Sequence, residues 1–262
     1  MKIIVCIKQV PDTNEVKLDP KTNTLIRDGV PSIINHDDKA GLEAALQIKE
    51  QTGATVTAVC MGPPQADVAL REALAMGCDE AYLISGREFG GSDTCATAII
   101  ISAALKKIGY DLIITGRQAI DGDTAQVGPQ IAENLGIPQI SYAEDVQIDG
   151  DVLTVKRQYE DRYHIIEVKL PCLLTALQEL AEPRYMHAGG IVDAYEKDIP
   201  VITFDDIKDS INPAHIGLKG SPTNVVKSFT KQAKGAGAIL NVEPDEAVEE
   251  IMKCLAENTL FN

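Results

Sequence analysis

Strand-like and helix-like patterns alternate along residues 1–135, and this alternation limits the possible folds more than any other feature of the chain. Short apolar runs such as 54–60 and 81–85 are each followed by a stretch with helical spacing of apolar residues, such as 65–76 and 93–107. Alternation of this kind predicts an α/β fold, a parallel sheet with helices on both faces.

The carboxyl ends of the predicted strands mark the place to look for a ligand. Ligands of such sheets bind beyond these ends, near the point where the strand order reverses. Four loops follow the predicted strands, and they are residues 9–12, 61–64, 86–94 and 116–128. We expect these loops to converge at one edge of the sheet, because parallel strands end on the same side.

The pattern changes in residues 146–177. Two short runs around an Asp149-Gly150 turn predict a hairpin, and the apolar runs 163–170 and 172–177 predict further strands. We therefore expect a small antiparallel extension. After residue 177 the alternation stops, and glycines and prolines interrupt the chain repeatedly.

The rest of the chain is predicted to be a long C-terminal arm, which ends in an amphipathic helix over residues 246–258. We divide the chain into an α/β domain that would hold the ligand, residues 1–177, and the arm, residues 178–262. The arm either wraps its own domain or docks on another subunit. We favour docking, because a long segment without regular structure is usually functional.

Charge and composition argue against several classes of function. The net charge of −15 argues against binding to nucleic acid and to anionic membrane surfaces, since both attract basic proteins. No apolar run is long enough to span a bilayer, and the chain starts with strand-like residues 2–7, so we expect a cytoplasmic protein without a signal peptide. The six cysteines form no CxxC pair and the four histidines lack metal-ligand spacing, which predicts mostly buried thiols and no metal site.

Residues 116–129 carry the strongest local sign of a ligand. Gly116, Gly122 and Gly128 lie between a buried strand and a helix start, where unpaired N–H groups and the helix dipole favour an anion. We expect these glycines to take positive φ and to let the backbone approach a phosphate. The loop lacks the Walker lysine and the spaced Rossmann glycines, so an ordinary strand-to-helix turn is an equal alternative.

Polar residues in two other places suit the same ligand. Four of them stand at the start of the helix over 93–107, and they are Ser92, Asp93, Thr94 and Thr97. They cap that helix or face the ligand, while Asn35 and Asp38 either cap another helix or contact an adenine or ribose edge.

No catalytic side chain is evident, and 4% aromatic residues argue against a flavin stacked between rings. A cofactor held by loops and backbone would then supply the chemistry.

Six segments, in order and spread over nearly the whole chain, resemble the beta subunit of electron-transfer flavoproteins. They are residues 6–12, 61–64, 117–129, 168–172, 182–185 and 217–222. The resemblance implies an adenine nucleotide alpha-hydrolase-like fold and an arm that embraces an FAD-carrying alpha subunit. Residues 121–129 look like the loop of electron-bifurcating members, in which the beta subunit binds a second FAD.

Bifurcating members accept hydride from NADH, and the resemblance therefore implies a route for electrons. They would pass from the FAD of this subunit to the alpha-subunit FAD, a partner flavin dehydrogenase and ferredoxin. The dehydrogenase would be of the acyl-CoA type or an FAD-linked lactate dehydrogenase. The alternative is a non-bifurcating beta subunit that binds AMP as a structural ligand.

The resemblance also implies roles for individual residues, none of them catalytic and none of them a metal ligand. The implied cofactor-binding residues are Cys6, Lys8, Asn35, Asp38, Cys60, Met61, Gly62, Pro63, Gly91, Ser92, Asp93, Thr94, Thr97, Gln118, Asp121, Gly122, Asp123, Thr124, Ala125, Gln126, Val127 and Gly128. The implied partner contacts are Leu180, Glu182, Pro183, Arg184 and Tyr185. Leu180 would be an apolar anchor for the dehydrogenase, although by residue type a leucine is more often a core residue.

Overall fold

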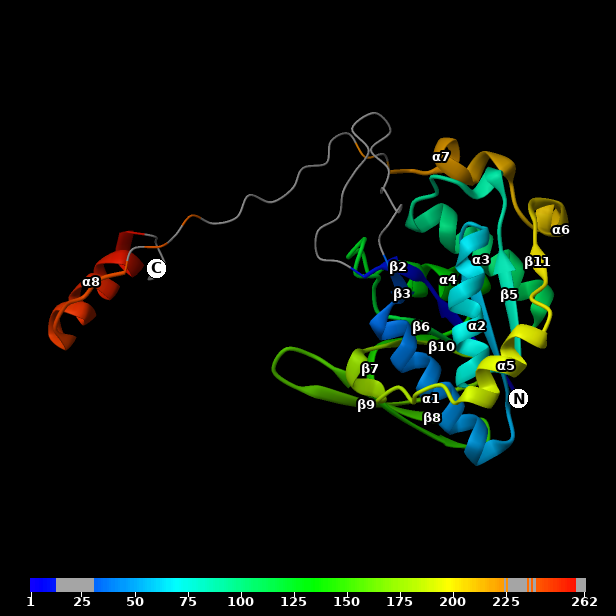
Figure 1. Ribbon diagram of the computed structural model, residues 1–262, viewed down its shortest axis with the longest axis horizontal. Helices are drawn as coiled ribbons and strands as arrows, with labels where there is room; N and C mark the ends of the chain where they lie inside the picture. The colour runs from blue at the N-terminus through cyan, green and yellow to red at the C-terminus, as the bar shows by residue number, and fades with distance from the viewer. Residues whose placement is uncertain (13–30, 224, 226–234, 236, 238, 258–262) are drawn as a thin grey trace. The chain divides into compact units, whose positions relative to one another are not determined.

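The computed structural model describes residues 1–12, 31–223, 225, 235, 237 and 239–257. The chain divides into two compact units, Met1–Val226 and Lys227–Asn262, each of which is described by itself. The first unit holds a nine-stranded sheet with helices on both faces (Figure 1). The expected α/β class, with a mostly parallel sheet and a small antiparallel extension, is therefore confirmed.

The sheet has the strand order β11-β5-β4-β1-β6-β10-β7-β8-β9. In that spatial order the strands are Val201–Ile202, Glu80–Ile84, Thr55–Met61, Lys2–Ile7, Leu112–Gly116, Cys172–Ala176, Gln139–Asp149, Val152–Gln158 and Tyr163–Lys169. Neighbours from β11 to β7 pair in parallel, and β8 and β9 continue as an antiparallel hairpin. A separate antiparallel pair joins β2 (Gln9–Pro11) to β3 (Ser32–Ile34). The central strands are buried on both faces, which explains their continuous apolar sequences.

Helices cover both faces of the sheet and enclose a core on each side. They are α1 (His36–Thr52) and α2 (Asp67–Met76) on one face, and α3 (Thr94–Ile108) and α4 (Val127–Leu135) on the other. Leu42 of α1 and Leu70 of α2 belong to the first core, and Ile100 of α3 belongs to the second.

Cys78 and Cys172 are buried as expected, and this burial raises the pKa of each thiol to about 12.

The antiparallel extension begins earlier than the sequence indicates. Strand β7 starts at Gln139 rather than at residue 146, and its first part lies parallel to β10. Its register shifts near Ala143 against both neighbouring strands, and Tyr142 takes a left-handed φ of 58°. This irregularity interrupts the alternation of side chains, which hides the start of the strand in the sequence.

Residues 178–223 belong to the first unit and contain short elements that the sequence did not predict. They are α5 (Ala188–Glu196), α6 (Phe204–Ile207), α7 (Gly217–Gly220) and strand β11, which pairs with β5 at the sheet edge. In the chain by itself this part of the arm therefore wraps its own domain, and the first unit runs to Val226. A functional boundary after residue 177 stays a prediction about the assembled protein.

The second unit contains α8 (Pro244–Glu257), close to the helix expected over 246–258. Asn258 lies outside the described residues. Val248, Ile251 and Met252 of α8 are exposed, so the apolar face predicted from the sequence is accessible. The docking of this helix on a partner stays a prediction.

No helix within the described residues is both long and apolar enough to cross a membrane.

Candidate nucleotide-binding site

A cavity of about 710 Å³ opens beyond the carboxyl ends of the central strands. Strand β1 pairs with β4 on one side and with β6 on the other. The chain builds β1, β4 and β5 first and then crosses back to β6, so the strand order reverses beside β1. Ligand sites of open α/β sheets form at such a point. Ile7 at the end of β1 and Gly116 at the end of β6 both line the cavity.

Most residues predicted to bind the cofactor line this one cavity. They are Cys6, Lys8, Asp38, Cys60, Met61, Gly62, Pro63, Gly91, Ser92, Asp93, Thr94, Thr97, Gln118, Gly122, Thr124, Ala125, Gln126, Val127 and Gly128. Asn35, Asp121 and Asp123 are not part of its lining. Ala66 and Thr223 do line it, although neither lies in the four loops that the sequence indicated. The binding roles of all these residues stay predictions.

Asn35 holds the glycine-rich loop in place. Its Nδ2 donates to the Gln118 carbonyl at 2.8 Å, and its Oδ1 accepts from the Ile120 N–H at 3.1 Å. The side chain is fully buried and makes no capping bond to α1, so the capping interpretation of Asn35 is wrong. Lys8 Nζ adds an ion pair to Asp121 Oδ1 at 2.6 Å, which fixes the same loop against the end of β1.

Asp38 joins the ends of the two central strands. Its Oδ2 accepts from the Lys8 N–H at 2.7 Å, and its Oδ1 accepts from the Gly116 N–H at 3.0 Å. Burial raises the pKa of this carboxyl to about 7, although hydrogen bonds from Lys8, Asn35 and Gly116 favour its charged form. The cavity wall therefore carries a carboxyl that is partly protonated near neutral pH, which reduces the repulsion of an anionic ligand.

The left-handed residues of the glycine-rich loop are not its glycines. Gly116, Gly122 and Gly128 have no positive φ, so that part of the prediction is wrong. Asp123 and Ala125 take left-handed φ values of 48° and 51° instead. Left-handed backbone at residues other than glycine costs free energy and is concentrated at functional sites.

Two of these glycines serve close packing inside the chain. A Cβ on Gly116 would collide with Asp38, and a Cβ on Gly128 would lie 2.6 Å from Thr115 Oγ1. Gly122 differs from them, because a Cβ there would meet no atom within 4 Å. Of the three, Gly122 is therefore the one whose missing side chain leaves open space for a ligand.

The N-termini of α3 and α4 meet at the cavity and are joined there by a hydrogen bond. Thr94 Oγ1, at the start of α3, donates to Gln126 Oε1, at the start of α4, over 2.8 Å. The first-turn N–H groups of a helix lack intrahelical partners, and the helix dipole adds positive charge. Arg117 also lines the cavity; its Nε is buried, has no hydrogen-bond partner among the described residues and lies 3.5 Å from Asp37 Oδ2. The first-turn N–H groups of α4, which receive no side-chain capping bond, fit the phosphates of a nucleotide.

The side chains that line the cavity suit binding better than acid–base or nucleophilic catalysis. No histidine is among the described residues that line it. Burial, together with the charge of Asp38, raises the pKa of the Cys6 thiol far above its usual range, which makes Cys6 a poor nucleophile. Chemistry at this site would come from a bound cofactor.

The predicted partner contacts differ widely in exposure. Leu180 is partly buried and packs against the core on the α1 face, which favours the core interpretation of this residue. Pro183 is partly buried and Glu182 is exposed. Tyr185 is 98% exposed, so it is the most accessible of the five. Their contact with a partner stays a prediction.

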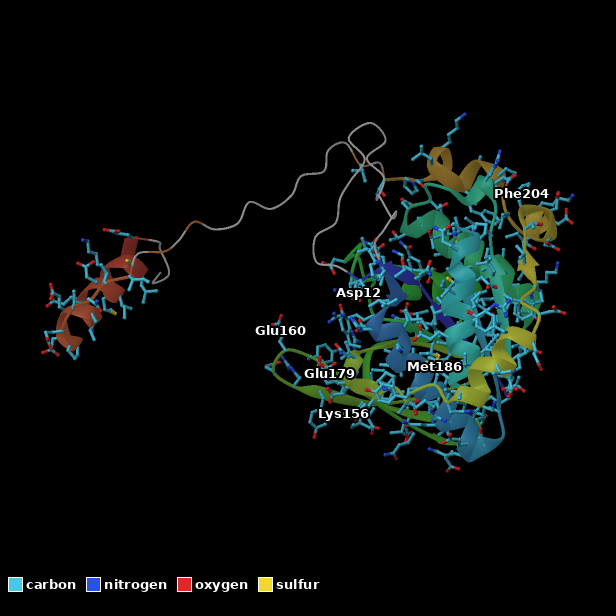
Figure 2. The ribbon with its side chains drawn as sticks, in the orientation of Figure 1. Asp12, Lys156, Glu160, Glu179, Met186 and Phe204 are labelled. Carbon is cyan, nitrogen blue, oxygen red and sulfur yellow. The ribbon has the colours of Figure 1, made fainter. Side chains whose placement is uncertain are left out.

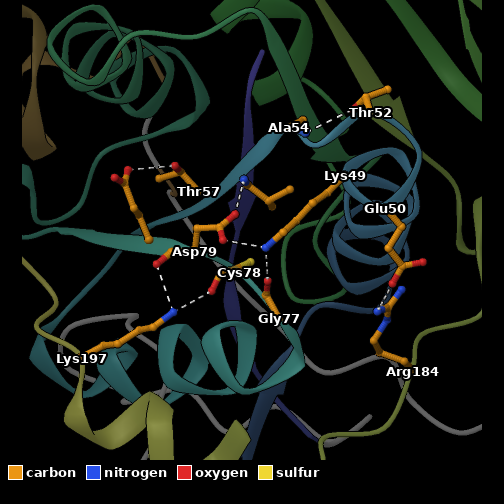
Figure 3. A network of polar contacts seen from close by, with 12 residues as sticks. Lys49, Glu50, Thr52, Ala54, Thr57, Gly77, Cys78, Asp79, Arg184 and Lys197 are labelled. Carbon is orange, nitrogen blue, oxygen red and sulfur yellow. Dashed lines mark hydrogen bonds and ion pairs between the residues drawn. The ribbon is translucent and has the colours of Figure 1, made fainter.

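Arg184 is held within the chain by α1. Its Nε lies 2.8 Å from Glu43 Oε2. Its Nη1 lies 2.6 Å from Glu50 Oε1 (Figure 3). Burial alone would raise the pKa of Glu43, but hydrogen bonds from Arg184 and Gln47 hold it below its usual value. Arg184 therefore positions the segment that carries Tyr185.

The fold and the cavity define an α/β protein with a cavity at the topological switch point whose lining suits a nucleotide. A family model described as an electron transfer flavoprotein domain matches residues 22–207. The chain is 55% identical over 257 residues to the electron transfer flavoprotein subunit beta of Clostridium acetobutylicum, with 98% of each chain covered. The chain belongs to the electron transfer flavoprotein family and is of the beta-subunit type.

Two further relatives are named as parts of reductase complexes. The caffeyl-CoA reductase-Etf complex subunit CarD of Acetobacterium woodii is 56% identical over 242 residues, with 92% of each chain covered. The acryloyl-CoA reductase electron transfer subunit gamma of Anaerotignum propionicum is 52% identical over 264 residues, with 98% of each chain covered. The chain is therefore similar to electron-transfer subunits of oxidoreductase complexes.

Proposed function

We propose that this chain binds FAD in the cavity at the switch point and acts in an electron-bifurcating flavoprotein of the cytoplasm. In this role FAD takes hydride from NADH and passes electrons to the alpha-subunit FAD, a flavin dehydrogenase and ferredoxin. The two relatives named as parts of caffeyl-CoA and acryloyl-CoA reductases favour a dehydrogenase of the acyl-CoA type.

The observation that carries the proposal is the size of the cavity together with its phosphate donors. AMP is one half of FAD, and a cavity of about 710 Å³ offers space for the other half beside it. The backbone around Gly122 and the hydroxyl of Thr124 would hold the diphosphate, close to the starts of α3 and α4. Phe89 is the one aromatic side chain among the described lining residues, so loops and backbone would hold the flavin ring.

A second cavity supports the approach of NADH. It has a volume of about 580 Å³ and shares Met61, Gly62, Pro63 and Phe89 with the first cavity. We place NADH in this second cavity, because hydride transfer requires the nicotinamide close to the flavin. The loops over 61–64 and 90–94 would then line its path.

The nonbifurcating alternative assigns AMP to the same phosphate donors. It makes the nucleotide a structural ligand and leaves the second cavity without a redox role. The two functions predict different cofactors, so cofactor content separates them.

The decisive experiment uses the complex of this chain with its alpha subunit. Nucleotides are extracted from the purified complex and quantified, and NADH is then added without oxygen while the flavin absorbance is followed. Two FAD per complex, bleached by NADH, support the proposal. One FAD and one AMP would establish the alternative, and two FAD that NADH does not reduce would refute bifurcation.

The dehydrogenase would dock on the exposed apolar side chains around α5, here called the docking face. They are Tyr185, Met186, Ile191, Val192 and Tyr195, of which Tyr195 is 66% exposed and Val192 is 60% exposed. Met186 lies beside α5 in Figure 2. Asp193 and Glu196 of the same helix are exposed acids, which suits a partner surface that is apolar with a basic rim.

A further inference from the structure

Residues 217–223, here called the strap, lie against the loop that leads into α3. The Leu218 N–H donates to the Gly90 carbonyl at 3.1 Å, and the Gly217 N–H donates to Ser92 Oγ at 3.0 Å. Gly91 has a φ of 75°, and a Cβ on it would lie 2.9 Å from Leu218 Cβ. The strap therefore approaches the loop as closely as the glycine permits.

The end of the strap is fastened to Asp93. Asp93 Oδ2 accepts from the Thr223 N–H at 3.0 Å and from Thr223 Oγ1 at 2.8 Å. Asp93 Oδ1 caps α3 by accepting from the Ala96 N–H at 3.0 Å, and the Asp93 N–H donates to Ser221 Oγ at 2.8 Å. Burial alone would raise the pKa of Asp93, but the bonds from Ala96 and Thr223 hold it below its usual value.

Asp93 thus has both carboxylate oxygens engaged within the chain. An unengaged carboxylate at this helix start would compete with a phosphate, because the same N–H groups and dipole attract either anion. Thr223 lines the cavity together with Ser92 and Asp93, whereas Ser221 does not line it. Thr223 is therefore part of the cavity wall, and Ser221 supports that wall from behind.

We propose that the strap is a wall of the nucleotide cavity and that Ser221 and Thr223 are positioning residues that set how long the nucleotide stays bound. The inference rests on the proposed function, since it requires a nucleotide in this cavity. Loss of the Ser221 or the Thr223 side-chain hydrogen bond to Asp93 loosens the wall and leaves Asp93 with fewer hydrogen bonds. Both effects speed the release of an anionic ligand.

The test measures nucleotide release from the full-length chain. FAD release is followed by the return of free-flavin fluorescence after dilution, and AMP release by radiolabel retained on a filter. Thr223→Val removes the hydroxyl bond to Asp93, and Ser221→Ala removes a strap contact outside the cavity. Each is expected to speed release roughly threefold to tenfold, the usual net effect of one hydrogen bond.

Two further variants make the test specific. Thr223→Ser keeps the hydroxyl donor and is expected to release the nucleotide at the wild-type rate. Thr203→Val removes a closely matched contact at a residue that does not line the cavity, since the Thr203 N–H and Oγ1 donate to Asp206 Oδ2 at 2.9 and 2.8 Å. It is expected to leave release unchanged.

The outcomes distinguish a failure of the strap proposal from a failure of the proposed function. Faster release in Thr223→Val and Ser221→Ala, with wild-type rates in the other two variants, supports the strap. Wild-type rates in both strap variants would overturn it and leave nucleotide binding standing. A wild-type chain that retains neither FAD nor AMP would overturn both.

Discussion

Asp38 combines structural and electrostatic roles at a single residue. Its carboxylate accepts the Lys8 and Gly116 N–H groups that end two central strands, and burial raises its pKa from 3.8 to about 7. Between these values the folded chain keeps a proton that the unfolded chain has released. The contribution of Asp38 to stability therefore falls as the pH rises from about 4 to 7, by up to about 1.4 kcal/mol per pH unit, and this loss stops above pH 7.

The Asp38→Asn variant tests this pH dependence. The asparagine cannot ionise, so the free energy of unfolding should depend less on pH between 5 and 7, even though losing an acceptor lowers it overall. Urea unfolding of the full-length chain at pH 5, 6, 7 and 8 measures the slope. Asp161→Asn is the control, because the Asp161 side chain is 73% exposed and should keep the wild-type slope. An unchanged slope in Asp38→Asn would contradict the assignment.

Gly122 offers a direct test of phosphate binding at the glycine-rich loop. Its φ is not left-handed and its surroundings are open, so valine should fit without disturbing the fold. The added side chain would occupy space next to the backbone donors, and we expect Gly122→Val to bind FAD at least about tenfold more weakly, a loss of roughly 1.4 kcal/mol.

Flavin content and titration with FAD measure that effect, and circular dichroism checks the fold. Ile120→Ala is the matched control, since Ile120 lies in the same loop, is 45% exposed and does not line the cavity. Full flavin occupancy in Gly122→Val would show that the loop does not approach the ligand.

Most lining residues could be predicted from the sequence because they follow strands or begin helices, and these features have local signals. Thr223, which lines the cavity, had no such signal, and for Asn35 the sequence indicated a helix cap or a ligand contact but not its role in holding the loop. Asn35 looks like a helix cap, yet it bonds to Gln118 and Ile120, more than eighty residues away. Thr223 reaches the cavity through its contact with Asp93, which no spacing within the sequence reveals.

At the scale of elements, α5 is braced by residues from outside it. Arg71 Nη1 of α2 donates to the Ala194 carbonyl at 2.7 Å. Lys197 Nζ, just after α5, donates to the carbonyls of Cys78 and Asp79 at 3.2 Å each (Figure 3). A Cβ on Gly190 would lie 2.6 Å from the Ala75 carbonyl oxygen, so α5 lies directly against the end of α2. These contacts hold the docking face in one orientation.

The Lys197→Met variant should loosen that brace. Loss of two hydrogen bonds from a charged donor costs roughly 1–3 kcal/mol locally. We expect the apparent KM for the partner dehydrogenase to rise about threefold to tenfold, while NADH oxidation with an artificial dye is unchanged. Lys208→Met is the control, because Lys208 pairs with Asp205 in its own turn. Equal loss of both activities would point to a general defect instead of a docking defect.

The elements that the sequence predicts well are those with a local signal, either an apolar run or a regular spacing of apolar residues. The helix expected over 93–107 is Thr94–Ile108, and the strand expected over 54–60 is Thr55–Met61. Helix α5 escaped prediction because it starts Ala-Gly-Gly, and glycine costs about 1 kcal/mol in a helix. Its formation is supported by contacts that are distant in sequence, among them those of Arg71 and Lys197.

At the scale of the whole first unit, the cavity joins the two halves of the sheet. Loops after β1 and β4 line one side, and the loop after β6 lines the other, with the strap residue Thr223 added at the wall. The chain carries a net charge of −15, so an anionic ligand gains little from the overall field. Its binding free energy must come from local donors, which belong to several elements and exist together only in the folded state.

A ligand that binds these donors should therefore stabilise the whole first unit. Saturation at one hundred times Kd adds about 2.7 kcal/mol, which for a unit of this size raises Tm by roughly 5–10 °C. Thermal unfolding of the full-length chain with and without FAD, and separately with AMP, measures the shift. Gly122→Val should lose most of this Tm shift at the same FAD concentration, whereas Ile120→Ala should keep it.

If FAD and AMP both leave Tm unchanged at high concentration, the cavity is not a nucleotide site in the isolated chain. A larger shift with FAD than with AMP at equal concentration would favour the dinucleotide, because the additional half then contributes binding of its own.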